Sequence, residues 1–137
     1  MITIKTNTID VQDYLSIRAN VEWKELSVAQ ARKALEHSIC VIGAYENDRL
    51  VGMGRIVGDG AVICYIQDLI VDPEYQGKGI GSLMLKHLIG YVEELKEKDS
   101  NMMLCLMCAK GREEFYKKHG FIARPTENLG PGMIQYL

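Results

Sequence analysis

Three closely spaced glycines, Gly77, Gly79 and Gly81, follow a run rich in isoleucine and valine and precede a helical pattern. Glycine lets a backbone approach an anion closely, and the first amides of a helix have no acceptor within that helix. The positive end of the helix dipole points the same way. We therefore expect the amides from Gly77 to Ser82 to form a cradle for phosphate groups.

The sequence of this turn does not match two common nucleotide-binding motifs. The P-loop needs a glycine five residues before Gly77 and a serine or threonine after Lys78, and neither is present. The dinucleotide fingerprint needs a third glycine where the chain has Ser82. Both nucleotide-binding families are therefore disfavoured.

The elements that must position the turn follow from hydrophobic periodicity. Residues 61–71 predict a strand that leads into the turn, and residues 80–95 predict an amphipathic helix that leads out of it. Residues 102–107 predict a further strand, buried on both faces. A strand, a helix and a second strand in this order indicate a right-handed crossover between parallel strands.

The remaining segments predict an otherwise antiparallel sheet with additional helices. Asp10 and the capping box from Ser27 to Gln30 each indicate a helix start, and Trp23 between the two helices is interpreted as a core anchor. A short helix is expected at 111–118. The predicted strands outside the crossover are 2–5, 39–45, 49–57 and 133–136.

The predicted fold is a single α+β domain over residues 1–137, with a mixed, mostly antiparallel central sheet flanked by helices and one βαβ unit. A hydrophobic content of 47% supports one continuous core. The formal charge of −2 leaves no basic face for nucleic acid, and no apolar run approaches a membrane span. Four cysteines in apolar runs suit reduced thiols, so we expect a cytoplasmic protein without a metal site.

The residues Gln76-Gly77-Lys78-Gly79-Ile80-Gly81 resemble the signature Gln/Arg-x-x-Gly-x-Gly/Ala of the GNAT superfamily of N-acetyltransferases, which use acetyl-coenzyme A. The resemblance extends upstream through residues 67–75. Downstream it reaches the segment Phe115-Tyr116 to Gly120-Phe121. With the predicted order of elements, it covers essentially the whole chain.

The resemblance implies which residues hold the cofactor and transfer the acetyl group. Main-chain groups of Leu69, Ile70 and Val71 would hold the pantetheine arm, and one of their amides would face the oxyanion. Gln76, Gly77, Lys78, Gly79, Ile80, Gly81 and Ser82 would hold the diphosphate. Tyr116 would be the general acid, because a phenol with a pKa of about 10 can protonate a leaving thiolate.

The proton acceptor is left open between a carboxylate and a water chain. Asp68 is the preferred base, because a charge within an apolar strand needs a partner or a cavity, and Glu22 is the weaker candidate. Tyr65 and Gln67 alternate onto one face and either line the acceptor pocket or pack across strands.

The expected reaction is transfer of an acetyl group to the primary amine of a small molecule, with a protein amine as the second choice. A homodimer would be compatible with the fold. A non-catalytic acyl-coenzyme A sensor is the first alternative, because it would keep the glycine turn without needing an acid. A nucleotide-binding module is the second.

Overall fold

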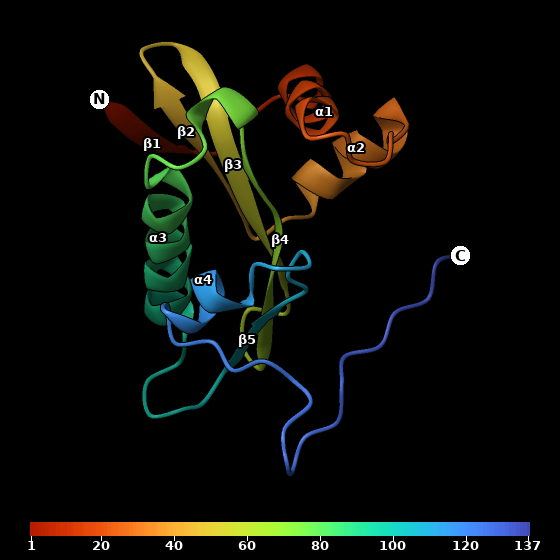
Figure 1. Ribbon diagram of the computed structural model, residues 1–137, viewed down its shortest axis with the longest axis vertical. Helices are drawn as coiled ribbons and strands as arrows, with labels where there is room; N and C mark the ends of the chain where they lie inside the picture. The colour runs from red at the N-terminus through yellow and green to blue at the C-terminus, as the bar shows by residue number, and fades with distance from the viewer.

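A computed structural model describes residues 1–137 as a five-stranded sheet with helices on both faces (Figure 1). The strands lie in sequence order, and they are β1 (Ile2–Thr6), β2 (Cys40–Glu46), β3 (Arg49–Gly58), β4 (Ile63–Val71) and β5 (Met103–Leu106). The helices are α1 (Val11–Asn20), α2 (Val28–Glu36), the 3-10 turn η1 (Pro73–Tyr75), α3 (Ile80–Leu95) and α4 (Glu113–Lys117). None of these helices is long and apolar enough to cross a bilayer.

The sheet has the mixed topology that the sequence predicts. β1 to β4 pair antiparallel with their neighbours, and β5 pairs parallel with β4 after the α3 crossover. The expected helix starts are also present. Asp10 accepts a hydrogen bond from the amide of Asp13, and Ser27 and Gln30 form a reciprocal capping box. Local sequence therefore determines where α1 and α2 begin.

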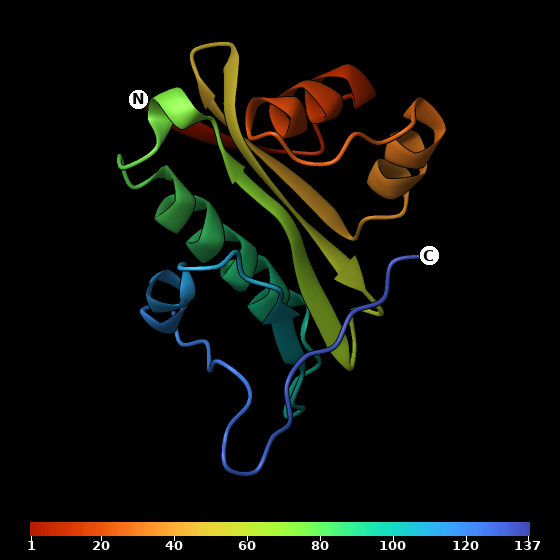
Figure 2. The same ribbon diagram turned by 45° about the vertical axis from the view of Figure 1, so that its right-hand side comes forward.

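Two apolar clusters hold the layers together. α1 and α2 cover one face of the sheet through a cluster that includes Tyr14, Ile17 and Ile70. α3 covers the other face through a larger cluster that includes Met84, Leu85 and Leu88 (Figures 1 and 2). β4 lies between the two clusters, so its position is fixed from both sides.

A β-bulge interrupts β4 at Asp68. The register with β3 shifts between Met53 and Arg55, and Asp68 has a left-handed backbone with φ of 56°. Ile66 and Leu69 consequently both pack on the α3 face, although strict alternation would place them on opposite faces. The bulge thus rotates the last part of β4 relative to its first part.

The C-terminal part of the chain differs from the prediction. The expected strand at 133–136 does not form, because no backbone hydrogen bond joins this segment to the free edge of β5, and Met133 is 88% exposed. β5 is shorter than expected and is not buried on both faces. It is an edge strand with Met103 51% exposed. The segment after α4 loops away and returns past β5 without joining the sheet (Figure 2).

Candidate active site

A cleft of about 510 Å³ lies between β4, the start of α3 and α4. Of the ten residues predicted to hold the cofactor, all but Lys78 line it, and so does Tyr116. Its full lining is Val21, Trp23, Leu69, Ile70, Val71, Tyr75, Gln76, Gly77, Gly79, Ile80, Gly81, Ser82, Ala109, Arg112, Phe115 and Tyr116. The structure therefore brings the predicted turn, strand and acid into one cavity.

The cleft exists because β4 and β5 separate. Their parallel pairing ends where Ile66 meets Leu106, while β4 continues to Val71. Asp72 donates its amide to the carbonyl of Val51 at 2.8 Å, so Asp72 faces β3. Because successive residues of a strand turn their main-chain groups to opposite sides, those of Val71 face the open side. β4 thus presents to the cleft an edge that has no neighbouring strand.

The glycine turn supplies the other end of the cleft. Gly77 and Gly79 have φ values of 77° and 82°, a left-handed conformation that other residues rarely adopt. The amides from Gly77 to Ser82 donate to no acceptor within the protein, and no side chain caps α3. Gln76 donates its side-chain amide to the carbonyl of Val71 at 3.0 Å and ties the turn to β4. A row of unbonded amides at the start of a helix is suited to an anion.

Lys78 points out of the cleft and takes part in a surface stack. Its ammonium lies 5.0 Å from the ring centre of Tyr75, and the guanidinium of Arg49 lies 5.1 Å from the same ring. Tyr75 donates its hydroxyl to Glu46 at 2.5 Å. These contacts fix the Tyr75 ring as a wall of the cleft.

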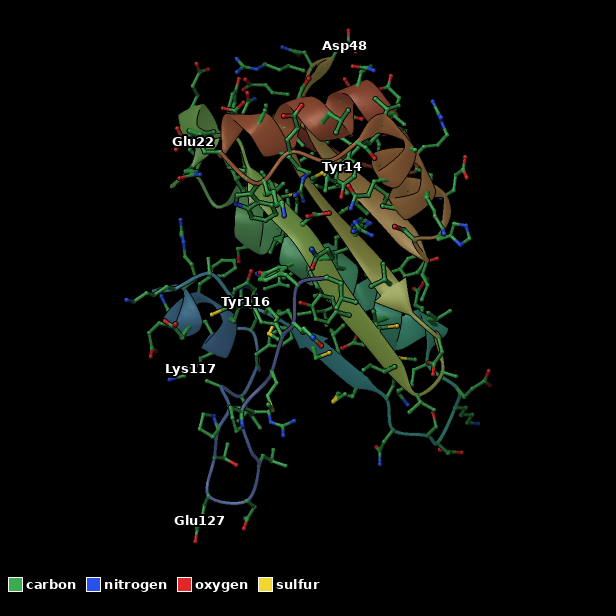
Figure 3. All side chains as sticks on the ribbon, turned by 90° about the vertical axis from the view of Figure 1, so that its right-hand side faces the viewer. Tyr14, Glu22, Asp48, Tyr116, Lys117 and Glu127 are labelled. Carbon is green, nitrogen blue, oxygen red and sulfur yellow. The ribbon has the colours of Figure 1, made fainter.

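The side chain of Tyr116, a residue of α4, points from the helix towards the sheet, whereas the side chain of its neighbour Lys117 points away from the sheet (Figure 3). Its ring contacts Phe115 and Phe121 edge to face, with ring centres 5.0 and 5.9 Å apart. Burial, aided by the nearby thiol of Cys108, raises its pKa above the usual value for tyrosine. The hydroxyl has no hydrogen-bond partner in the protein, so Tyr116 remains a neutral phenol with a proton to donate.

Asp68 is buried at the bulge and is bonded to three donors. Arg18 donates to one carboxylate oxygen and Arg55 to the other, each at 2.7 Å. Tyr14 donates its hydroxyl to the same oxygen as Arg55. Burial, followed by this bond to Asp68, raises the pKa of Tyr14 to about 12. The arrangement links α1, β3 and β4, and it favours a structural role for Asp68. The proposed role of Asp68 as a base stays a prediction.

The comparisons with known proteins agree with this geometry. The family model described as "Acetyltransferase (GNAT) family" matches residues 8–121. The chain belongs to the GNAT acetyltransferase family. An uncharacterized N-acetyltransferase from Prochlorococcus marinus is 30% identical, over 90% of this chain and 69% of that protein.

Two solved structures also match this GNAT chain closely. A protein of unknown function from meticillin-resistant Staphylococcus aureus is 31% identical with a TM-score of 0.86, over 99% of this chain and all of the other. A GNAT-family acetyltransferase from Streptococcus pneumoniae is 33% identical with a TM-score of 0.84, over 100% of this chain and 98% of the other.

Sequence reasoning missed the role of Trp23 in this GNAT site. The interpretation of Trp23 as a core anchor is wrong, because the side chain is 40% exposed and lines the cleft. Its ring lies 5.4 Å from the guanidinium of Arg18, which also donates to the carbonyl of Lys24 at 2.9 Å. The Asp68 network therefore also positions an aromatic wall of the GNAT cleft. Only the contact between Arg18 and Asp68, fifty residues apart, reveals this link.

Glu22 and Tyr65, both predicted to lie on the acceptor side, are in different parts of the structure. Glu22 is exposed, has a left-handed backbone with φ of 59°, and does not line the cleft. Tyr65 lines a second cavity of about 710 Å³ between β5, α4 and the C-terminal segment, and Tyr116 lines this cavity too. Burial raises the pKa of Tyr65. Tyr116 thus lies between the cleft beside α3 and a second cavity.

Proposed function

We propose that this GNAT protein transfers an acetyl group from acetyl-coenzyme A to the primary amine of a small molecule, with a protein amine as the second choice. One observation carries the proposal: a single cleft has unbonded helix-start amides at one end, an unpaired strand edge along its length and a free phenol on its wall. Family membership supports it independently.

The residues of the cleft are suited to the parts of coenzyme A. The amides from Gly77 to Ser82 would accept the diphosphate, and the main chain of Val71 would bond to the pantetheine arm as a neighbouring strand would. The space between β4 and β5 narrows towards the bulge, because the two strands pair as far as Ile66 and Leu106. The thioester would therefore lie near Leu69.

Catalysis requires one bond to form and one to break. The amine nitrogen bonds to the acetyl carbon, and a main-chain amide of the segment from Leu69 to Val71 stabilises the oxygen that becomes negative. The carbon–sulfur bond then breaks, and Tyr116 gives its proton to the leaving thiolate. The amine proton passes to water, which returns a proton to Tyr116. Asp68, with three donors on its carboxylate, would hold the bulge in place instead of taking that proton.

Calorimetry and a thiol-release assay test the proposal. We expect coenzyme A to bind, and at least one member of an amine library to release its thiol from acetyl-coenzyme A. Tyr116→Phe should lower kcat by about a hundredfold with little change in coenzyme A affinity, as expected for loss of a general acid. Tyr91→Phe on α3, outside the cleft, is the matched control and should retain full activity.

Two results would contradict the proposal in different ways. Coenzyme A that fails to bind folded protein would remove the basis for the cleft assignment. Binding without turnover by any amine would favour the non-catalytic sensor, for which Tyr116→Phe should leave ligand binding unchanged.

A further inference from the structure

The bulge in β4 carries more positive than negative charge. Asp68 is the one carboxylate in its network, and it pairs with the guanidiniums of both Arg18 and Arg55. Tyr14 adds no charge, because its hydroxyl keeps its proton. Both arginine side chains are nearly buried, with 11% and 12% exposure. A positive charge in such a place is stabilised when an anion joins it.

Arg55 has a donor free to bind that anion. It donates Nε to Asp68 at 2.7 Å and Nη1 to the hydroxyl of Ser38 at 3.2 Å, while Nη2 makes no hydrogen bond. Nε of Arg18 is the only fully buried side-chain nitrogen without a hydrogen-bond partner, so Nη2 of Arg55 is not fully buried. Arg18, by contrast, donates both of its terminal nitrogens, to Asp68 and to the carbonyl of Lys24.

Arg55 lines neither cavity, but its place on β3 is next to the part of β4 where acyl transfer would occur. Arg55 is the register partner of Gln67 on β4, two residues before Leu69. Side chains of directly opposed residues in a sheet are about 5 Å apart at their Cβ atoms. Arg55 and Asp68 are on the face covered by α1 and α2, whereas α3 covers the opposite face. An acceptor that approaches Leu69 from the α1 and α2 side would therefore meet Arg55.

We propose that the acceptor amine carries an anionic group, a carboxylate or a phosphate, and that Arg55 binds this group while the amine reaches the thioester. The proposal rests on the proposed function and names its substrate class. A guanidinium presents paired donors to oxyanions and keeps its charge at every physiological pH. Acceptors with only positive charges, such as polyamines, would be repelled by the same site.

Matched acceptor pairs test this proposal in the thiol-release assay. Amino acids are compared with their decarboxylated amines, and phosphorylated amino sugars with their unphosphorylated forms. The wild type should favour the anionic member of one or both pairs by about ten- to hundredfold in kcat/KM, the value of a charged hydrogen bond. The pair that shows the preference distinguishes carboxylate from phosphate.

Variants then assign the preference to Arg55. Arg55→Gln should abolish the preference for anionic acceptors and leave the affinity for coenzyme A unchanged. Arg55→Lys should keep part of the preference, because lysine retains the positive charge but lacks the paired donors of the guanidinium. Arg32→Gln on the exposed side of α2 is the control and should keep the full preference. If Arg55→Gln does not fold, the lysine variant still decides, because a preference equal to that of the wild type would overturn the assignment.

A binding measurement separates this proposal from the proposed function. Inorganic phosphate should bind to protein already saturated with coenzyme A, and Arg55→Gln should bind it at least about tenfold more weakly, with Arg55→Lys between this variant and the wild type. The proposal would be overturned if kcat/KM were equal for the anionic and the neutral member of every pair, or if phosphate binding were absent or equal in all variants. Either result would leave the acetyltransferase assignment intact. Phosphate binding without turnover of any amine would support Arg55 and contradict the acetyltransferase assignment.

Discussion

Asp68→Asn offers the sharpest test of the network at the β4 bulge. The substitution keeps the size of the side chain and removes its charge, which leaves the guanidiniums of Arg18 and Arg55 without a counter-ion. Asparagine also tolerates the left-handed backbone, so the φ of 56° should add little strain. The expected loss of stability thus comes from the network alone.

The size of the loss follows from the burial of the network. Asp68 is 3% exposed, and breaking a buried ion pair by removing one partner costs about 3–5 kcal/mol. An unfolding entropy of about 2.1 cal/mol/K per residue gives about 0.29 kcal/mol/K for 137 residues. The melting temperature should therefore fall by about 10–17 °C.

Urea unfolding and a thermal melt measure this change, with Tyr14→Phe as the companion variant. Removing the Tyr14 hydroxyl deletes one hydrogen bond to the carboxylate and should cost about 1.5–3 kcal/mol, because both ion pairs of Asp68 remain. If Asp68→Asn lost less than about 1 kcal/mol of stability, the structural interpretation would be wrong. If that stable variant also lost its turnover, Asp68 would be the base after all.

Two further predictions concern the glycine turn and alkaline pH. Gly79→Ala, at φ of 82°, should weaken coenzyme A binding about tenfold in calorimetry, whereas Gly90→Ala inside α3 should stabilise the protein by about 0.5–1 kcal/mol and leave binding unchanged. Unfolded tyrosine releases its proton near pH 10, but folded Tyr14 keeps its proton until about pH 12. Tyr14 alone should thus lower the stability by about 2–3 kcal/mol between pH 10 and 12, and the decrease measured by urea unfolding of Tyr14→Phe should be smaller by that amount.

Much of the fold could be predicted because its determinants are local. The capping box at Ser27, the turn at Gly79 and the crossover through α3 each follow from a few neighbouring residues. Nine of the residues predicted to hold the cofactor line one cleft, and their proximity was predictable for the same reason, since they belong to one continuous stretch of chain.

The rest depends on contacts between distant residues. Asp68 was recognisable as a charge in an apolar strand, but its partners Arg18 and Arg55 lie 50 and 13 residues away. The bulge adds one residue to β4 without changing the apolar character of the segment. Trp23 was assigned to the core because its size suggests burial, and only the arrangement of α1 against β4 shows that it borders a cavity.

The glycine turn and the edge of β4 present main-chain groups to the cleft, and this matters for inhibitor design if the cleft holds coenzyme A as proposed. Compounds that mimic the diphosphate or the pantetheine arm would meet the unbonded amides after Gly77 and the strand edge at Val71, features that any chain with the same turn and strand can offer. Selective compounds would have to contact side chains of the cleft such as Val21 and Trp23. Extending a weak cofactor mimic past Leu69 towards those two residues is therefore the route to discrimination between relatives.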